Sequence, residues 1–323
     1  MSTSYQHSDD MSGLYEASSI GCVDTLNQLL HQNPQILHKI SLTSFTETPL
    51  HISSLLGHLD FTKALLSHKP QLALELNSSR STPLHLASAE GHIQIVKELV
   101  GVNEEACLVG DEEGRIPLHY AAMRGRMEVV RELVRAKPES LSLRDNINGN
   151  TTLHFCVIYN HLETLKAIVE LLEPERSGEL LNYTNSDGKN TILHLAVMFK
   201  QVEYLLTIPE IRSEARSMKN ERGYTVHEML ERSPKDMKSL RIQLMFINYN
   251  IIDQSQTPEP TRDVADDDEE VERPRENNES NCCVIRIYKS IVNWFRPKDM
   301  DKWFKEMKSN LSVVAILIST LSF

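Results

Sequence analysis

A tetrapeptide of the form Thr-Pro-Leu-His recurs along the chain at nearly constant spacing, and this repetition limits the possible folds more than any other feature. The copies begin at Thr48, Thr82, Ile116, Thr151 and Thr191, so successive copies are 34, 34, 35 and 40 residues apart. A period of roughly 20 to 50 residues is typical of proteins in which one supersecondary unit stacks on the next. The sequence therefore predicts a stack of repeats.

Helix-ending residues follow the first four copies at a fixed distance. Six residues after the histidine stands Gly57, Gly91, Gly125 or Asn160. Glycine and asparagine most readily adopt the left-handed conformation that ends many helices. An apolar stretch comes next, as in residues 93–100. Each repeat is therefore predicted to contain two helices separated by this residue.

These residues together resemble the ankyrin repeat, whose pattern is a turn, Thr-Pro-Leu-His-x-Ala, a first helix, a glycine and a second helix. The resemblance covers about residues 10–235 and includes degenerate copies at Leu14 and Gly223. It implies an all-α solenoid of helix-turn-helix repeats with short hairpin loops, with about seven repeats in residues 10–250. Atypical end repeats are expected because they cap such a solenoid.

The five repeated histidines could be interpreted as metal ligands or general bases. Each lies at the same place in its unit, about 34 residues from the next, so the side chains are expected to stack along the array without converging. We therefore expect structural hydrogen bonds from them. Cys156 occupies a position that alanine fills in three other repeats, so it is expected to be a buried structural residue.

Sequence motifs for catalysis are missing from the chain. It has no glycine-rich phosphate loop, no Gly-x-Ser-x-Gly, no His-Glu-x-x-His and no Cys-x-x-Cys. The sequence therefore predicts a protein that is not an enzyme, with no catalytic residue, cofactor, metal or small-molecule substrate.

Two departures from the pattern indicate where the array becomes irregular. Residues 170–178 are an insertion, which is predicted to lengthen the second helix of that repeat or the loop after it. Lys200 stands where the pattern has glycine. We expect an irregular array after residue 170.

Partner binding is expected at the positions that vary from repeat to repeat, because the repeated positions are used in contacts between neighbours. Aromatic, methionine and arginine side chains are enriched at the centres of interfaces. The candidate partner-binding residues are Phe45, Glu47, Glu90, Arg115, Met123, Arg124, Tyr159 and Phe199. Packing between repeats is an equally open role for Tyr159 and Phe199. Replacing Arg115 and Arg124 by glutamate is predicted to abolish partner capture without changing the melting temperature.

The charge distribution argues against nucleic acid as the partner. The net charge is −11, and residues 259–279 hold ten acidic and three basic residues, a balance of −7. Residues 280–323 hold seven basic and three acidic residues, a balance of +4, so residues 1–258 carry −8. Such a surface repels phosphate backbones. The composition of residues 251–281 predicts an acidic disordered linker.

The cysteine pattern and the N-terminus favour synthesis in the cytosol. Five cysteines, mostly far apart, do not form the even set that a disulfide framework needs, so a reducing compartment is the simpler interpretation. Residues 1–10 are polar and lack the apolar run of a secretory signal.

Residues 282–323 are predicted to form an amphipathic segment and a membrane-directed helix. Within residues 285–308, aromatic and basic side chains occur together, which is typical of a membrane interface. The last thirteen residues, 311–323, have no charge, whereas a full membrane span needs about 20 residues. A membrane contact through residues 285–323 is expected, and Cys282 and Cys283 are candidate lipidation sites.

Residues 300–323 resemble the opening of the PGG domain of plant ankyrin proteins, a run of the form Asn-Leu-x-Val-Val-Ala-x-Leu-Ile-Ala-Thr-x-x-Phe. The matching residues are Asn310, Leu311, Val313, Val314, Ala315, Leu317, Ile318, Thr320 and Phe323. The resemblance stops before the Pro-Gly-Gly. With the repeats, it points to the plant family of the Bian-da, accelerated-cell-death and increased-salt-tolerance proteins, whose full-length members are implied to be multi-pass membrane proteins in immune and stress signalling.

Three interpretations of the short apolar run remain open: a fragmentary or alternative transcript, a short tail anchor, or a segment packed on protein. The predicted function is a membrane-associated protein-interaction adaptor in plant defence or stress signalling, at the plasma membrane with the repeats cytosolic. The alternative is a soluble cytosolic ankyrin adaptor or inhibitor whose terminal run does not insert in a membrane.

Overall fold

The computed structural model describes residues 2–42 and 47–252, and every regular element in these ranges is a helix. The prediction of an all-α fold is confirmed there. The chain divides into two compact units, Met1–Met229 and Leu230–Phe323, and each is described separately below.

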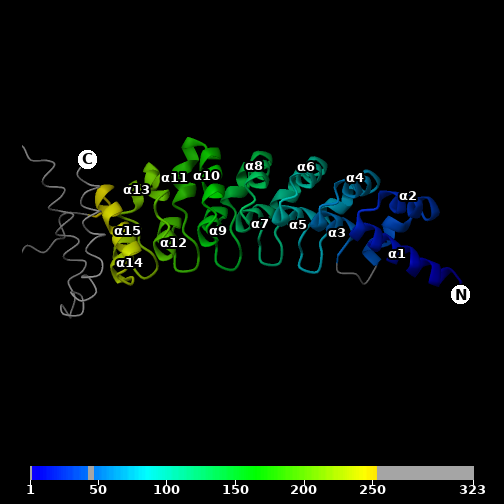
Figure 1. The fold of residues 1–323 in the computed structure, drawn as a ribbon, viewed down its shortest axis with the longest axis horizontal. Coiled ribbons are helices and arrows are strands. Elements are labelled where there is room, and N and C mark those ends of the chain that lie inside the picture. The colour runs from blue at the N-terminus through cyan, green and yellow to red at the C-terminus, as the bar shows by residue number, and fades with distance from the viewer. Residues whose placement is uncertain (1, 43–46, 253–323) are drawn as a thin grey trace, which may run out of the picture. The chain divides into compact units, whose positions relative to one another are not determined.

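The first helices of the repeats form one row in the first unit (Figure 1). Each packs on the next one in the row, and we call them the inner helices: α1 (Ser2–Ile20), α3 (Pro49–Leu56), α5 (Pro83–Glu90), α7 (Pro117–Met123), α9 (Thr152–Ile158) and α12 (Ile192–Phe199). The repeated tetrapeptide sets where they begin. Thr82 precedes α5 in extended conformation, Pro83 takes the first helical position, and Leu84 is fully buried.

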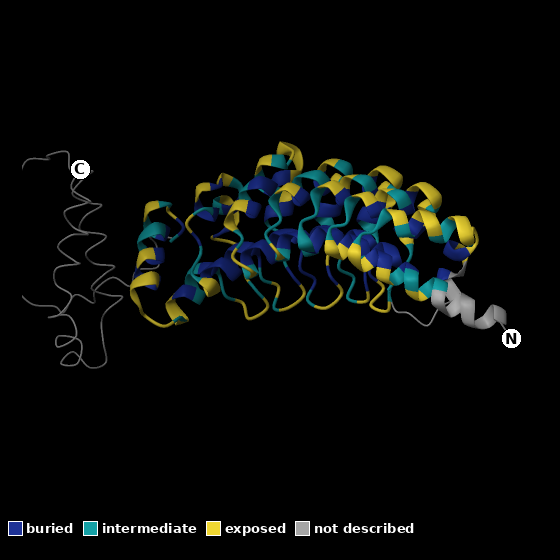
Figure 2. Cartoon of the chain, turned by 45° about the vertical axis from the view of Figure 1, so that its right-hand side comes forward, coloured by how far each residue is buried: buried dark blue, intermediate teal, exposed yellow. Residues whose placement is uncertain are grey.

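The second helices form a parallel row that packs on the first (Figure 1). These outer helices are α2 (Val23–Gln32), α4 (Leu59–His68), α6 (Ile93–Val102), α8 (Met127–Ala136) and α10 (Leu162–Leu171). Their buried side chains recur at helical spacing, as Ile95, Val96 and Leu99 do in α6. The buried core therefore lies between the two rows, while exposed residues gather on the outer helices and the hairpin tips (Figure 2).

A short helix follows most outer helices, and the insertion changes this element. The earlier repeats have the 3-10 helices η1 (Ile36–Leu42), η2 (Pro70–Leu74), η3 (Glu104–Leu108) and η4 (Pro138–Ser142). In the inserted segment α10 ends at Leu171, and Pro174 begins a separate helix, α11 (Pro174–Leu181). The prediction of a longer second helix or loop was wrong. A proline disrupts a helix when it lies in the interior, because it lacks a backbone N–H, but it is favoured in the first turn, so Pro174 begins a new helix.

The array is irregular after residue 170, as predicted. Following α12, a three-residue 3-10 helix, η5 (Leu205–Thr207), and α13 (Pro209–Glu214) replace the ten-residue outer helix of the earlier repeats. Lys200 nevertheless ends α12 with a φ of +58°, so it adopts the left-handed conformation that the pattern assigns to glycine.

The second unit begins inside α14 (Val226–Arg232) and contains α15 (Met237–Asn248). The Asp236 carboxylate caps α15 by accepting the backbone N–H of Ser239 at 2.8 Å. The linker and the C-terminal segment lie outside the described residues from position 253 onward, as do Cys282 and Cys283. None of the helices in residues 2–42 and 47–252 is both long and apolar enough to cross a membrane.

Replacing Ser88 by alanine is expected to raise the free energy of unfolding by about 1 kcal/mol. Ser88 is fully buried in α5, and its hydroxyl has no hydrogen-bond partner among the described residues. The matched control is Ser53→Ala, because the Ser53 hydroxyl lies 2.9 Å from that of Thr62 and its loss leaves a buried hydroxyl unpaired. Urea titrations should show the two variants shifting in opposite directions, and a less stable Ser88→Ala variant would contradict the prediction.

Candidate functional site

The repeated histidines join the inner helices α3, α5, α7, α9 and α12 to backbone carbonyls further along the chain. The His85 Nδ1 accepts the backbone N–H of Thr82 at 3.0 Å, so the proton is on Nε2, which donates to the carbonyl of Arg115 at 3.0 Å. The Nε2 atoms of the other four contact carbonyl groups in the same direction: His51 to Ser81, His119 to Leu143, His154 to Asn190 and His194 to Tyr224. The structural role predicted for these histidines is confirmed.

Burial keeps these imidazoles neutral. It lowers the pKa of His51, His85, His119 and His154 to about 4, and it also lowers the pKa of His194. The prediction for Cys156 is likewise confirmed: the side chain is buried, and desolvation raises the pKa of its thiol well above the usual range.

A second set of side chains joins the repeats in the opposite direction, and sequence reasoning missed it. These residues follow the glycine or asparagine that ends an inner helix, and they bond to a carbonyl near the end of the preceding inner helix: His58 to Ser19, His92 to Leu55, Arg126 to Ala89 and His161 to Met123. The distances are 2.9 to 3.0 Å. Only their fixed place directly after the helix-ending glycine or asparagine could have revealed them.

The hairpins between repeats are held by their own polar side chains. In the hairpin of Asp111, the carboxylate Oδ1 accepts the backbone N–H groups of Glu113 and Arg115 at 2.9 and 2.8 Å. Asn77, Asp145, Asn185 and Asn220 accept backbone N–H groups in the corresponding way. Backbone bonds also connect neighbouring hairpins, as from Asn146 N–H to the Glu113 carbonyl at 2.8 Å. The hairpins therefore form an ordered edge beside the inner helices.

Two equivalent hairpin carboxylates differ in one hydrogen bond. The Asp111 Oδ2 accepts the hydroxyl of Tyr120 at 2.6 Å, and burial is the main cause that raises the pKa of Tyr120 to about 12. One repeat later Phe155 takes the place of Tyr120, and the buried Oδ2 of Asp145 has no hydrogen-bond partner among the described residues.

The Phe155→Tyr variant is therefore expected to unfold with a free energy about 1 kcal/mol higher, because its hydroxyl can donate to Asp145 as Tyr120 does to Asp111. Tyr120→Phe is the reciprocal change and should lower stability by a similar amount. Thermal and urea unfolding measure both. Loss of stability in both variants would show that the site near Asp145 has no room for the hydroxyl.

The side of the inner helices that is turned away from the core carries a nearly apolar surface. Its residues are the one after each repeated histidine and those three and four places further on, which share a helix face. We call this set of positions the inner strip: Ile52, Leu55, Leu56, Leu86, Ala89, Glu90, Tyr120, Met123, Arg124, Phe155, Ile158, Tyr159, Leu195, Met198 and Phe199. Three of them, Ala89, Phe155 and Leu195, are buried. Glu90 and Arg124 are its only charged members.

Several large apolar side chains of the inner strip remain exposed to solvent. The exposed fractions are 48% for Leu56, 46% for Tyr159, 55% for Met198 and 43% for Phe199. Tyr159 also lies 6.4 Å from Phe155, measured between ring centroids, so it packs partly on its own helix. On α5 and α7 the apolar side chains of the strip are half-buried or buried. Exposed apolar side chains on one face of an array form a surface suited to a second molecule.

The structure brings five of the predicted contact residues together on the inner strip: Glu90, Met123, Arg124, Tyr159 and Phe199. It does not place the others there. Phe45 lies outside the described residues. The Glu47 carboxylate accepts a hydrogen bond from the Asn77 amide at 2.9 Å, and partial burial raises its pKa.

Arg115 has contacts within its own array that sequence reasoning did not foresee. Its guanidinium forms an ion pair with Glu113 and lies 5.8 Å from the centre of the Phe155 ring. Replacing Arg115 by glutamate therefore changes the scaffold as well as the surface, so Arg124 alone is the better test of binding. Leu55 and Leu56 were not among the predicted contact residues, although they share the helix positions of Met123 and Arg124.

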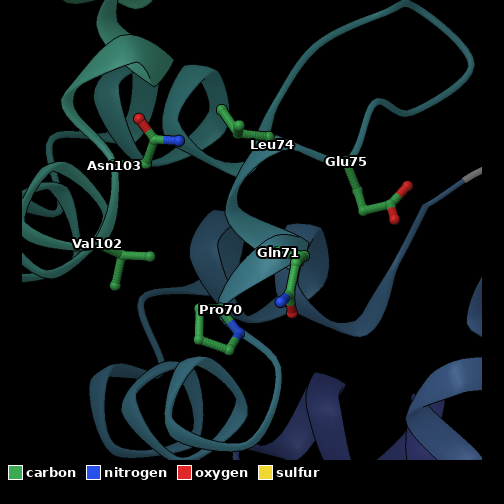
Figure 3. Close-up of a pocket in the computed structure, with 6 residues that line it drawn as sticks. All are labelled: Pro70, Gln71, Leu74, Glu75, Val102 and Asn103. Carbon is green, nitrogen blue, oxygen red and sulfur yellow. The ribbon is translucent and has the colours of Figure 1, made fainter.

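An open depression lies elsewhere, beside η2 and the end of α6 (Figure 3). It is lined by Pro70, Gln71, Leu74, Glu75, Val102 and Asn103. None of the predicted contact residues lines it, and Glu75 is its one ionisable side chain. Within residues 2–42 and 47–252, no three histidine, cysteine or acidic side chains are grouped so that they could hold a metal ion.

Comparison with known families identifies the class of protein. A model of ankyrin repeats in three copies matches residues 14–108 and 100–178, which together span 165 of the 323 residues. The chain belongs to the ankyrin-repeat family. The repeats indicate a role in protein–protein interaction, and proteins of this kind are generally non-enzymatic binding scaffolds. No curated protein matches the chain.

Proposed function

We propose that the chain is an adaptor that captures a protein partner on the inner strip. The observation that carries this proposal is the exposure of large apolar side chains at three of the inner helices, with Leu56 on α3, Tyr159 directly after α9, and Met198 and Phe199 on α12. Large apolar side chains are costly to leave in water, and aromatic residues and methionine are enriched at interface centres. The hydrogen bonds between repeats support the proposal because they hold this surface in a fixed form before binding.

Substitution of Tyr159 and Phe199 by serine tests the adaptor proposal. Partner capture in pull-downs from plant extract is expected to fall at least about tenfold, since exposed aromatic anchors commonly contribute more than 1 kcal/mol each to binding. Ile147→Ser is the matched control, because Ile147 is 60% exposed at a hairpin outside the inner strip. The inner strip would not be the binding surface if the double variant and the Ile147→Ser control lost partner capture equally. The same conclusion would follow if the double variant captured the partner as well as the parent chain does.

We further propose that the adaptor works at the plasma membrane in plant defence or stress signalling, with its repeats in the cytosol. The support comes from the resemblance of residues 300–323 to the start of a PGG domain and from the aromatic and basic residues before it. Residues 285–323 would make the membrane contact, and Cys282 and Cys283 would be available for lipidation. A soluble cytosolic adaptor or inhibitor is the alternative.

Cell fractionation of the full chain and of a form without residues 311–323 separates these two functions. The full chain is expected in the membrane fraction and the shortened form in the soluble fraction. A Cys282→Ser and Cys283→Ser double variant tests the contribution of lipidation in the same assay. If both the full and shortened chains are wholly soluble, the membrane proposal is lost and the cytosolic adaptor remains.

A further inference from the structure

Arg124 is an exposed cation in the middle of the inner strip, whose members other than Glu90 are apolar or aromatic. It follows α7 directly, next to Met123, and it has no ion-pair partner among the described residues. The other charge of the strip, Glu90, stands one repeat earlier and already lies 3.9 Å from the guanidinium of Arg126. A partner that covers the strip must therefore supply an acidic group opposite Arg124, since an unpaired charge is costly to bury.

The spacing of the inner helices indicates the form of such a partner. Packed helices lie about 8–10 Å apart. Seven residues of an α-helix span about 10.5 Å and end on nearly the same face of that helix. Three residues of an extended strand also span about 10 Å, but an odd step places successive side chains on opposite faces. A helix can therefore offer one apolar side to every repeat, whereas an extended chain cannot.

We infer that the partner segment is an amphipathic α-helix that lies across the inner helices, with apolar residues at seven-residue intervals and an acidic residue opposite Arg124. This inference rests on the proposed function of the inner strip. From α3 to α12 the strip crosses four helix spacings, or about 40 Å, which matches a helix of about 27 residues. In the partner helix, a basic residue seven positions from the acidic residue would face Glu90. The two opposite charges then fix the direction of the bound helix.

Selection from a displayed library of random peptides of about 28 residues, with the full chain as bait, tests this inference. The peptides that bind are expected to share an apolar heptad pattern with one acidic position, and to gain helical circular dichroism on binding. The Arg124→Glu substitution should lower the affinity of the chain for these peptides at least about tenfold. Replacing the acidic residue of the peptide by lysine should restore binding to the Arg124→Glu variant. Arg135→Glu, an equal charge change at an exposed position of α8, should leave binding unchanged.

The possible outcomes separate the inference from the function on which it rests. Binding that depends on Tyr159 and Phe199 but comes from peptides without the heptad or the acidic residue overturns the helical partner and keeps the inner strip as the binding surface. Binding that no inner-strip substitution affects overturns both. Melting temperatures of the variants must match that of the parent, so that loss of binding is not loss of fold.

Discussion

At pH 5 the free energy of unfolding is expected to be several kcal/mol lower than at pH 7. Four buried histidines, His51, His85, His119 and His154, have a pKa of about 4 in the folded chain, compared with about 6.5 when unfolded. Between these two pKa values the unfolded chain binds protons that the folded chain does not bind. Each histidine therefore lowers the free energy of unfolding by about 1.4 kcal/mol for each pH unit of acidification. Chemical denaturation at a series of pH values measures the effect.

The direction follows from the proton positions. Above pH 6.5 both states are neutral and the stability is complete, and it is lost progressively as the pH falls toward 4. Protonation of Nδ1 would place a second donor against the backbone N–H that this atom accepts, as in the pair of His85 and Thr82. His154→Gln should lower stability at pH 7 but reduce the pH dependence by about a quarter. Equal denaturation midpoints at pH 7 and pH 5 would show that these histidines take up protons as readily in the folded chain as in the unfolded chain.

The Gly149→Ala variant is expected to lose about 3 kcal/mol of unfolding free energy. Gly149 has a φ of +64°, which costs an L-residue about 1–2 kcal/mol. An added Cβ would also lie 2.8 Å from the backbone nitrogen of Ser186 in the next hairpin. That nitrogen cannot easily move, because it donates to the carbonyl of Asn148 at 2.7 Å.

Gly178→Ala is the matched control for this change. Gly178 lies inside α11, and a Cβ there would meet no atom within 4 Å. Alanine is a better helix former than glycine, so this variant should gain about 0.5–1 kcal/mol. Thermal unfolding of both proteins under one set of conditions gives the comparison. A Gly149→Ala variant as stable as Gly178→Ala would mean that the hairpins are not held against one another.

The main features of the repeat fold could be predicted because they depend on local rules. Threonine and proline start an inner helix, and glycine ends it with positive φ, as Gly57 and Gly91 do at +84° and +88°. Asn160 has the same role at +58°. The inserted helix α11 was not predicted, because a periodic pattern shows that residues are added but not where the chain breaks its helix.

The candidate surface was predicted only in part, for a similar reason. Repeat phase alone places Arg124, Tyr159 and Phe199 on the exposed face of the inner helices. It cannot show that Arg115 turns toward Glu113, because that contact depends on the conformation of the hairpin. Leucines such as Leu55 and Leu56 were not considered, since apolar residues in a repeat are normally assigned to the core, although these two are 42% and 48% exposed.

The two opposing sets of hydrogen bonds have a consequence for how the array opens. An interior repeat such as that of His85 and His92 is held from both sides, so it cannot detach without breaking bonds to both neighbours. Among the described residues, the bonds that reach back to the preceding inner helix end with that of His161. The bonds of the repeated histidines, which reach forward along the chain, continue to His194. Amide hydrogens of the repeats after α9 should therefore exchange with deuterium first, and opening should spread from there toward the N-terminal repeats.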